Sequence, residues 1–217
     1  MKKCIVIANG KGPKKNLILY FQKLGYSTLI CADGGANSLL KLKLTPDYII
    51  GDLDSIDQST LDSFASISKV IKIKRQNDTD VEKCLKFAIK NKMEDVILFG
   101  ATGDRLDHTI CNIGIVLKFF DRIKIRIIHD KSILSAYSGK VLFDSVVGET
   151  ISLYGFDRKT TITSRGLKYP LKKTALPFGV RESTSNVAAK NMIELDIKNG
   201  TIFVIRDFET MRINGLI

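Results

Sequence analysis

Aspartates in short loops are the residues of this chain best suited to chemistry. They stand in four segments: ADGGAN (32–37), GDLDS (51–55), QNDTD (76–80) and GATGDRLDH (100–108). Nearly every one follows an apolar run typical of a β-strand. Carboxylates in that position mark the edge of an open α/β sheet, where phosphates and Mg²⁺ bind. The chain as a whole is basic, with a net charge of +11, so this acidity is local and is expected to have a function.

Two of these aspartates, Asp52 and Asp54, are predicted to bind one cation. They stand two residues apart, after the apolar run Tyr48–Ile50 and a glycine, so both can reach one ion if the backbone turns. Mg²⁺ prefers hard oxygen ligands, usually one or two carboxylates together with the phosphates of a substrate. The alternative is a turn in which Asp54 or Ser55 caps the next helix. That alternative does not explain Asp52.

Asp33, Gly34 and Gly35 follow the strand-like run Thr28–Ala32. A glycine pair lets the backbone approach a ligand closely, and the helix expected after it offers free N–H groups to an anion. Glycines in a strand-to-helix turn are explained equally well by geometry. The segment alone therefore does not decide between a ligand site and a turn.

The QNDTD segment opens a helix, where capping and the helix dipole favour carboxylates even without a ligand. Thr79 or Asp78 can cap this helix. The acidic pair of GDLDS lies nearby in the order of the sheet and favours Asp80 as a third metal ligand. The ligand-binding candidates from the same segment are Gln76, Asn77 and Thr79.

The segment GATGDRLDH combines four residue types that suit a phosphate site. Gly103 suits a loop facing phosphate, Arg105 a bidentate phosphate contact, and Asp107 with His108 a cation or acid–base contact. The alternative is a surface loop with an Arg–Asp ion pair. The density of Gly, Arg, Asp and His within these residues favours the ligand site.

Strand-like and helix-like segments alternate up to about residue 130, which predicts an α/β domain with a mainly parallel sheet and flanking helices. The expected strands are Cys4–Ala8, Thr28–Ala32, Tyr48–Ile50, Val70–Lys74, Val96–Phe99 and Ile123–Ile128, and the expected helices include Asn16–Leu24, Thr79–Asn91 and Leu106–Phe120. From Ser132 onward, short β-rich runs predict an antiparallel β-sandwich, with Asn199-Gly200 as a hairpin turn. The predicted domains are residues 1–130 and 131–217.

In the β-rich half, four residues are candidates for binding an aromatic ligand. Tyr169 can stack on a ring, and Ser183, Ser185 and Asn186 can hydrogen-bond one. Clusters of Ser, Thr and Asn also form ordinary turns, and this alternative stays open.

Composition narrows the class of protein. No apolar stretch approaches the ~20 residues of a membrane span. The start, MKKCIVIANGKG, has too short an apolar run for a secretory signal, so a cytoplasmic protein without a membrane partner is expected. Two histidines argue against zinc and leave carboxylate sites for magnesium or manganese. No dense basic run occurs, so no nucleic-acid partner is expected, and the positive charge suits polyanionic small molecules such as ATP.

Taken together and in this order, ADGGAN, GDLDS, the TD element with its helix, GATGDRLDHT and GLKY…STSN resemble thiamine pyrophosphokinase (thiamine diphosphokinase) sequences. The resemblance runs from Asp33 to Asn186, and the pair GDLDS with G-x-T-G-x-R-x-D-H is specific. It implies an α/β catalytic domain that binds ATP and Mg²⁺, followed by a β-sandwich that binds thiamine. It also implies a homodimer in which thiamine lies between the β-sandwich of one subunit and the α/β domain of its partner.

The resemblance further implies roles for single residues at the metal and the nucleotide. Asp52 and Asp54 match the acidic pair that holds magnesium and the triphosphate, and Asp80 matches the acid of the TD element. The loop that meets nucleotide and metal is matched by Arg105, Asp107 and His108.

At the thiamine site, Asp33 matches an acid near the path of thiamine and phosphate. Ser183 and Asn186 match the STSN element that contacts the pyrimidine ring of thiamine. The chain departs from the family in two places. Asn77 stands where the family often has aspartate, and Tyr169 stands where some members have tryptophan.

The implied reaction is ATP + thiamine → AMP + thiamine diphosphate, in which the thiamine hydroxyl attacks the β-phosphorus. Asp52, Asp54 and Asp80 would hold one or two magnesium ions. Arg105 would offset phosphate charge, and Asp80 or Asp33 would accept the hydroxyl proton. Two other functions fit the same motifs: transfer of diphosphate to another alcohol such as a hydroxymethylpterin, and a Mg-dependent phosphohydrolase.

Overall fold

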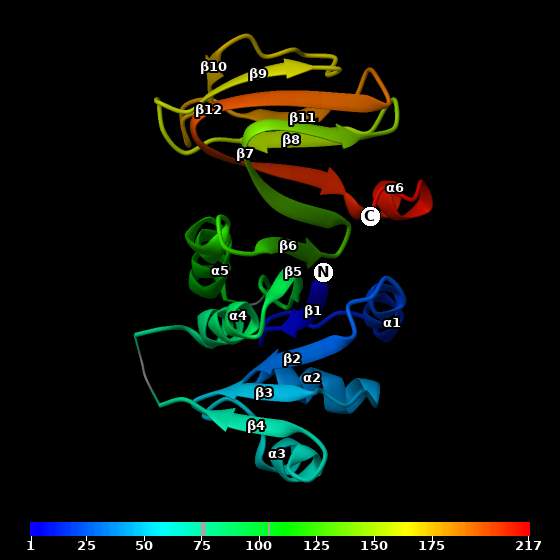
Figure 1. Cartoon of the computed structure of the whole chain (residues 1–217), viewed down its shortest axis with the longest axis vertical. Helices are drawn as coiled ribbons and strands as arrows, with labels where there is room; N and C mark the ends of the chain where they lie inside the picture. The colour runs from blue at the N-terminus through cyan, green and yellow to red at the C-terminus, as the bar shows by residue number, and fades with distance from the viewer. Residues whose placement is uncertain (75–76, 104) are drawn as a thin grey trace. The chain divides into compact units, whose positions relative to one another are not determined.

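The computed structural model describes residues 1–74, 77–103 and 105–217. The chain forms two compact units, Met1–His129 and Asp130–Ile217 (Figure 1). The first combines a parallel sheet with helices and the second is built mainly of antiparallel strands, so the predicted fold class is confirmed.

The N-terminal unit is a parallel sheet with the strand order β6-β5-β1-β2-β3-β4. Its strands are β1 (Lys2–Ile7), β2 (Thr28–Ala32), β3 (Tyr48–Gly51), β4 (Lys69–Lys72), β5 (Met93–Phe99) and β6 (Lys124–His129). The helices are α1 (Lys15–Lys23), α2 (Gly35–Leu42), α3 (Gln58–Phe64), α4 (Asp80–Lys90) and α5 (Leu106–Phe119). The central strands are apolar on both faces, as is typical of a parallel sheet covered by helices.

The order of the strands leaves a crevice at their carboxyl ends. From β1 the chain adds β2, β3 and β4 in one direction, and then returns to place β5 on the other side of β1. At such a switch the loops that leave neighbouring strands diverge, and ligands of open α/β sheets bind between them. Here the loops after β1 and β5 run side by side, since Gly10 N–H donates to the carbonyl of Gly100 and Lys11 N–H to that of Thr102.

Of the helices next to the acidic segments, α4 has a side-chain N-cap and α3 has none. Thr79 caps α4 in a capping box with Glu82, so of the two predicted caps Thr79 is confirmed. The helix after GDLDS is α3, and Asp57 occupies its N-cap position. Asp54 and Ser55 do not cap it, so that alternative for Asp54 is wrong.

The C-terminal unit is a sandwich in which one long strand serves both sheets. Its elements are β7 (Ser132–Asp144), β8 (Thr150–Tyr154), β9 (Thr161–Arg165), β10 (Thr174–Ala175), β11 (Ser183–Val187), β12 (Met192–Asp207) and α6 (Phe208–Ile213). Strand β12 pairs with β7 along its whole length, with β9 in its first half and with β8 in its second. The apolar core is formed by inward side chains such as Leu153, Ile162, Leu195 and Val204.

The hairpin predicted at Asn199-Gly200 is wrong. The two β-rich runs on either side form the single strand β12, and the pairing register with β7 shifts between Ile197 and Thr201. Asn199 has a φ of +59° within this irregularity, which bends the strand. The local signal agrees with the left-handed backbone at Asn199 but carries no information about β7, which pairs with β12 on both sides of the bend.

The double glycine of ADGGAN has a packing reason. A Cβ on Gly35 would lie 2.2 Å from the carbonyl oxygen of Ile7, and one on Gly34 would lie 2.5 Å from the amide of Asn9. Helix α2 therefore starts so close to the end of β1 that only glycine fits at position 35. We expect Gly35→Ala to destabilise the protein by about 1–3 kcal/mol or more, as for an overpacked core site.

Chemical unfolding measures this effect, and Gly114→Ala serves as the control. Gly114 lies in α5 with no atom within 4 Å of an added Cβ, so its replacement is expected to raise stability slightly. A Gly35→Ala variant as stable as the parent would contradict the packing argument.

Candidate active site

A crevice of about 700 Å³ in the N-terminal unit lies at the carboxyl ends of β1, β2, β3 and β5. It is lined by the loops after these strands, by the start of α4 and by one side of α5. Eight of the predicted site residues line it: Asp33, Asp52, Asn77, Thr79, Asp80, Gly103, Arg105 and His108.

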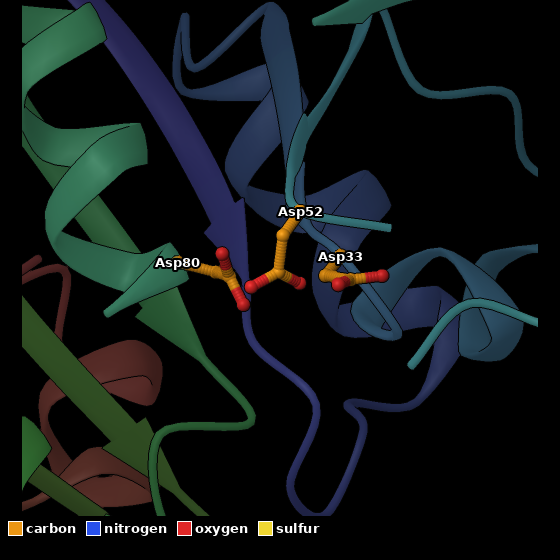
Figure 2. Close-up of side chains that lie close together, drawn as sticks. All are labelled: Asp33, Asp52 and Asp80. Atoms are coloured by element: carbon orange, nitrogen blue, oxygen red, sulfur yellow. The ribbon is translucent and has the colours of Figure 1, made fainter. Parts of the chain in front are cut away.

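Three carboxylates converge in this crevice. Asp33 follows β2, Asp52 follows β3 and Asp80 is the first residue of α4, and an oxygen of each lies within 4.8 Å of the others. Figure 2 shows Asp52 between the other two. We call these residues the acidic cluster. At that separation two like charges repel by about 3–4 kcal/mol at an effective dielectric constant of about 20, so the cluster requires compensating partners.

Backbone N–H groups compensate Asp33. Its carboxylate is 1% exposed and accepts hydrogen bonds from Asp54 N–H at 3.1 Å, Ser55 N–H at 3.4 Å and Ile56 N–H at 2.9 Å. Asp33 thus ties the end of β2 to the loop after β3. Its own backbone has a φ of +44°, which directs the side chain toward this loop.

Lys83 compensates the other two carboxylates, and the sequence analysis missed it. Its ammonium lies 2.7 Å from Asp80 Oδ1 and 3.8 Å from Asp52 Oδ2, and its side chain is 3% exposed. The available signal was the spacing of Asp80 and Lys83, three residues apart on one helix face. Nothing in the sequence, however, distinguished Lys83 from the many other lysines.

The environment shifts the pKa of Asp33, Asp52 and Lys83. Burial, the Asp80 charge and contact with Asp52 raise the pKa of Asp33 against the opposing backbone hydrogen bonds. For Asp52, burial acts in the raising direction, but the contact with Asp33 and the Lys83 charge outweigh it and lower the pKa. For Lys83, burial alone would lower the pKa, and the bond to Asp80 with the neighbouring carboxylate charges raises it. Lys83 is therefore a cation and Asp52 an anion at neutral pH.

The donor set fits a divalent cation that prefers oxygen. The cluster supplies carboxylate oxygens from three separate elements, and Asp52 Oδ1 is buried without a hydrogen-bond partner among residues 1–74, 77–103 and 105–217. A buried carboxylate oxygen without a partner costs free energy unless a cation or a donor meets it. Carboxylates of this kind suit Mg²⁺ or Mn²⁺.

Asp54 lies outside the acidic cluster. Leu53 has a φ of +65°, so the backbone turns between Asp52 and Asp54, and the exposed Asp54 carboxylate accepts a hydrogen bond from Ser55 Oγ at 2.8 Å. The side chain of Asp54 still contacts that of Asp52, and the third carboxylate of the acidic cluster beside Asp52 and Asp80 is Asp33.

The loop after β5 shows the Arg–Asp pair that had been weighed as the alternative. Arg105 Nη2 lies 2.5 Å from Asp107 Oδ2, and both side chains are more than half exposed. Arg105 and His108 nevertheless line the crevice, whereas Asp107 does not. The contact with Arg105, together with the backbone N–H of His108, lowers the pKa of Asp107 to about 2.

A second missed pair supports this loop. Thr102, which lines the crevice, lies with its Oγ1 2.6 Å from Nδ1 of His129, at the end of β6. Asn112 of α5 donates from Nδ2 to the carbonyl of Ala101 at 2.8 Å. The loop is thus held by contacts from β6 and α5, which were not predicted from the sequence.

The predicted ligand-binding residue Gln76 lies outside the described residues.

In the C-terminal unit, both polar atoms of the Asn186 side-chain amide form hydrogen bonds within the protein. Its Oδ1 accepts from the backbone N–H groups of Tyr169 and Val187, and its Nδ2 donates to the carbonyl of Tyr169 and to Ser183 Oγ. Asn186 is 2% exposed, whereas Tyr169 is 59% exposed. Ser185 stands at a φ of +54° in the same irregular part of β11. Asn186 therefore holds Tyr169 and Ser183 in place.

Comparisons with known proteins agree on one family. The family model described as "Thiamin pyrophosphokinase, catalytic domain" matches residues 22–152, and the one described as "Thiamin pyrophosphokinase, vitamin B1 binding domain" matches residues 140–202. Thiamin pyrophosphokinase 1 of Caenorhabditis elegans is 28% identical over 191 residues, which cover 81% of this chain and 77% of the relative. Thiamine pyrophosphokinase of Bacillus subtilis is 27% identical over 216 residues, which cover 95% and 99%.

Solved structures give the same picture. The crystal structure of the Bacillus subtilis thiamine pyrophosphokinase superposes with a TM-score of 0.78 at 27% identity, covering 94% of this chain and 99% of the other. The Candida albicans thiamin pyrophosphokinase superposes with a TM-score of 0.81 at 20% identity, covering 95% and 89%, and shares the fold.

The hydrogen bonds to Asp33 are expected to protect the amides of the loop after β3 from hydrogen exchange. In Asp33→Ala, three backbone N–H groups lose their acceptor, so the loop after β3 should open more often. Amide hydrogen exchange is expected to become at least about tenfold faster at Asp54, Ser55 and Ile56, because each lost bond is worth about 1 kcal/mol or more.

Asp47→Ala is the matched control for this experiment. Asp47 also accepts a backbone hydrogen bond, from Leu29 N–H at 2.7 Å, but at the start of β2. Its removal should leave exchange at residues 54–56 unchanged. Equal protection of these amides in Asp33→Ala and the parent would show that Asp33 does not hold the loop.

Proposed function

The chain belongs to the thiamin pyrophosphokinase family, and on that premise we propose which of its residues perform the reaction. The enzyme transfers pyrophosphate from ATP to thiamine, with ATP as co-substrate. Attack of the thiamine hydroxyl on the β-phosphorus gives thiamine diphosphate and AMP. Such transfers depend mainly on positioning and on neutralising phosphate charge.

The acidic cluster is the observation that carries the assignment of the catalytic residues. We propose that Asp52 and Asp80, from β3 and α4, hold Mg²⁺ in the crevice, with Asp54 joining when the metal–nucleotide complex is bound. Bound Mg²⁺ neutralises charge on the transferred phosphates. Asp33 already accepts three backbone hydrogen bonds, so its first role is to position the loop that carries Asp52. Asp80 is paired with Lys83, so Asp33 and Asp80 both stay candidates for the group that accepts the hydroxyl proton.

The loops around the cluster are proposed to bind the phosphates. Arg105 and His108 line the crevice together with Gly103, whose φ of +148° is a backbone conformation that glycine favours. The guanidinium of Arg105, now paired with Asp107, can turn to a phosphate and take a bidentate contact there. Asn77 and Thr79 line the opposite side at the start of α4. Gln76 and Asp107 stay predicted nucleotide contacts.

We propose that residues 1–130 form the catalytic domain and residues 131–217 the thiamine-binding domain. The vitamin B1 binding model, which matches residues 140–202, supports the second assignment. Tyr169 and Ser183 are the proposed contacts of the thiamine ring, with Ser185 beside them, and Asn186 holds them through its amide. A homodimer stays the proposed assembly, since exposed apolar side chains such as Leu106 and Ile110 on α5 offer contact area.

The described helices include none that is both long and apolar enough to cross a lipid bilayer. A cytoplasmic location and the absence of membrane and nucleic-acid partners remain predictions from the sequence.

Chromatography of reactions with ATP, Mg²⁺ and thiamine tests the assignment. AMP is expected to appear in step with thiamine diphosphate. In Asp52→Asn, kcat should fall by about 10²-fold or more while thermal unfolding stays near that of the parent, because the charge that holds the metal is lost without loss of volume. A similar fall in Asp54→Asn would place Asp54 in the metal shell.

Two outcomes would overturn parts of this proposal. Parental turnover in Asp52→Asn would remove the acidic cluster from the mechanism. Free phosphate without thiamine-dependent AMP would point to the hydrolase alternative, and AMP formed only with a hydroxymethylpterin would point to the other acceptor.

A heterodimer tests whether each site is shared between subunits. One subunit carries Asp52→Asn and the other Asn186→Ala, and the two are co-expressed with different tags and purified together. If the α/β unit of one subunit works with the β-sandwich of its partner, one of the two sites is intact, and about half of the parental activity is expected. Activity no higher than that of either homodimeric variant would show that each site lies within one subunit.

A further inference from the structure

Lys83 is a cation built into the acidic cluster. Its ammonium contacts Asp80 Oδ1 at 2.7 Å and lies 3.8 Å from Asp52 Oδ2, so it lies against the two carboxylates assigned to the metal. With a side chain 3% exposed, it is shielded from the water that would otherwise screen these charges.

The other lysines around α4 make a different kind of contact. Lys86 pairs with Asp78 at 2.5 Å, and Lys118 of α5 pairs with Glu82. Their side chains are 40% and 54% exposed, so both pairs are in contact with solvent. Among these three, Lys83 alone is buried, and it pairs with Asp80, three residues earlier on the same face of α4.

The position of Lys83 has a consequence for metal binding. A free divalent ion that enters the cluster meets the carboxylates and, within a few ångströms, a fixed positive charge. That charge occupies one oxygen of Asp80 and repels the ion. An ion that arrives bound to the phosphates of ATP brings negative charge with it, and the ammonium then attracts the complex.

We propose that Lys83 is a positioning residue that substitutes for a cation in the nucleotide-free protein, so that the cluster binds free metal weakly and takes up the metal together with the nucleotide. This inference rests on the proposed role of Asp52 and Asp80 as metal ligands. It extends that role to the order in which the ligands bind and to a residue outside the predicted site.

Binding of Mn²⁺ to the nucleotide-free protein tests the proposal. Isothermal titration, or the signal of free Mn²⁺ in electron paramagnetic resonance, gives the affinity. Lys83→Met keeps most of the length of the side chain and removes its charge, and is expected to bind Mn²⁺ at least about tenfold more tightly than the parent. A residue with a merely structural role would not raise metal affinity when replaced.

Lys86→Met is the matched control. It removes one positive charge from the same helix, at a pair outside the acidic cluster, and should leave Mn²⁺ affinity within about twofold of the parent because solvent screens it. Mn²⁺ affinity in Lys83→Met equal to or weaker than that of the parent overturns the proposal.

If Lys83→Met is too unstable for titration, thermal unfolding with and without Mn²⁺ still tests the proposal. The variant should melt below the parent without metal, and saturating Mn²⁺ should raise its melting temperature more than that of the parent. An equal rise in both proteins counts against the proposal.

Mn²⁺ binding by Asp52→Asn distinguishes failure of the proposed metal site from failure of the proposed role of Lys83. If Asp52→Asn binds Mn²⁺ as the parent does, the metal does not bind at the cluster and the assigned function of Asp52 fails. If Asp52→Asn loses Mn²⁺ binding while Lys83→Met matches the parent, only the inference about Lys83 fails.

Discussion

Repulsion between like charges is the constraint on which the rest of the N-terminal unit depends. Three carboxylates lie within 4.8 Å of one another, at a cost of several kcal/mol if nothing opposed it. Two devices oppose it. Backbone N–H groups of the loop after β3 surround Asp33, and the Lys83 ammonium lies against Asp52 and Asp80. Within the part of the chain that the structure describes, the compensation is incomplete, since Asp52 Oδ1 has no hydrogen-bond partner there, and a metal–nucleotide complex can supply one.

The sheet supplies the positions at which these devices work. Because β1 pairs with β2 on one side and β5 on the other, the loops after these strands open into one crevice. Glycine at Gly35 lets α2 start against the end of β1, and this brings Asp33 beside the loop of Asp52. Thr79 starts α4 with a capping box, which places Asp80 and Lys83 on the same side of the helix. Packing of the core and placement of charge are therefore parts of one arrangement.

Sequence reasoning predicted what depends on local chemistry and missed what depends on distant partners. The strands of the N-terminal unit, the capped start of α4 and the carboxylates at the strand ends have local signals and were predicted, whereas β10 and β11 were not. The position of Asp54 outside the acidic cluster was not predicted, because the turn after Asp52 includes Leu53 at a positive φ, a backbone conformation that leucine rarely adopts. The role of Lys83 depends on the packing of α4 against β2 and β3, which the local sequence does not predict. The hairpin at Asn199-Gly200 failed because its signal carries no information about β7.

The bend in β12 has a consequence for how the C-terminal unit unfolds. Each of its two sheets contains part of the same strand, and the first half of β12 pairs with β9 while the second pairs with β8. One sheet cannot separate from the other while β12 stays intact, since the backbone itself joins them. Loss of β12 from either sheet removes the strand that the other sheet also uses, so the two layers are expected to unfold together. A unit of this size thereby gains cooperativity from connectivity, without a larger core.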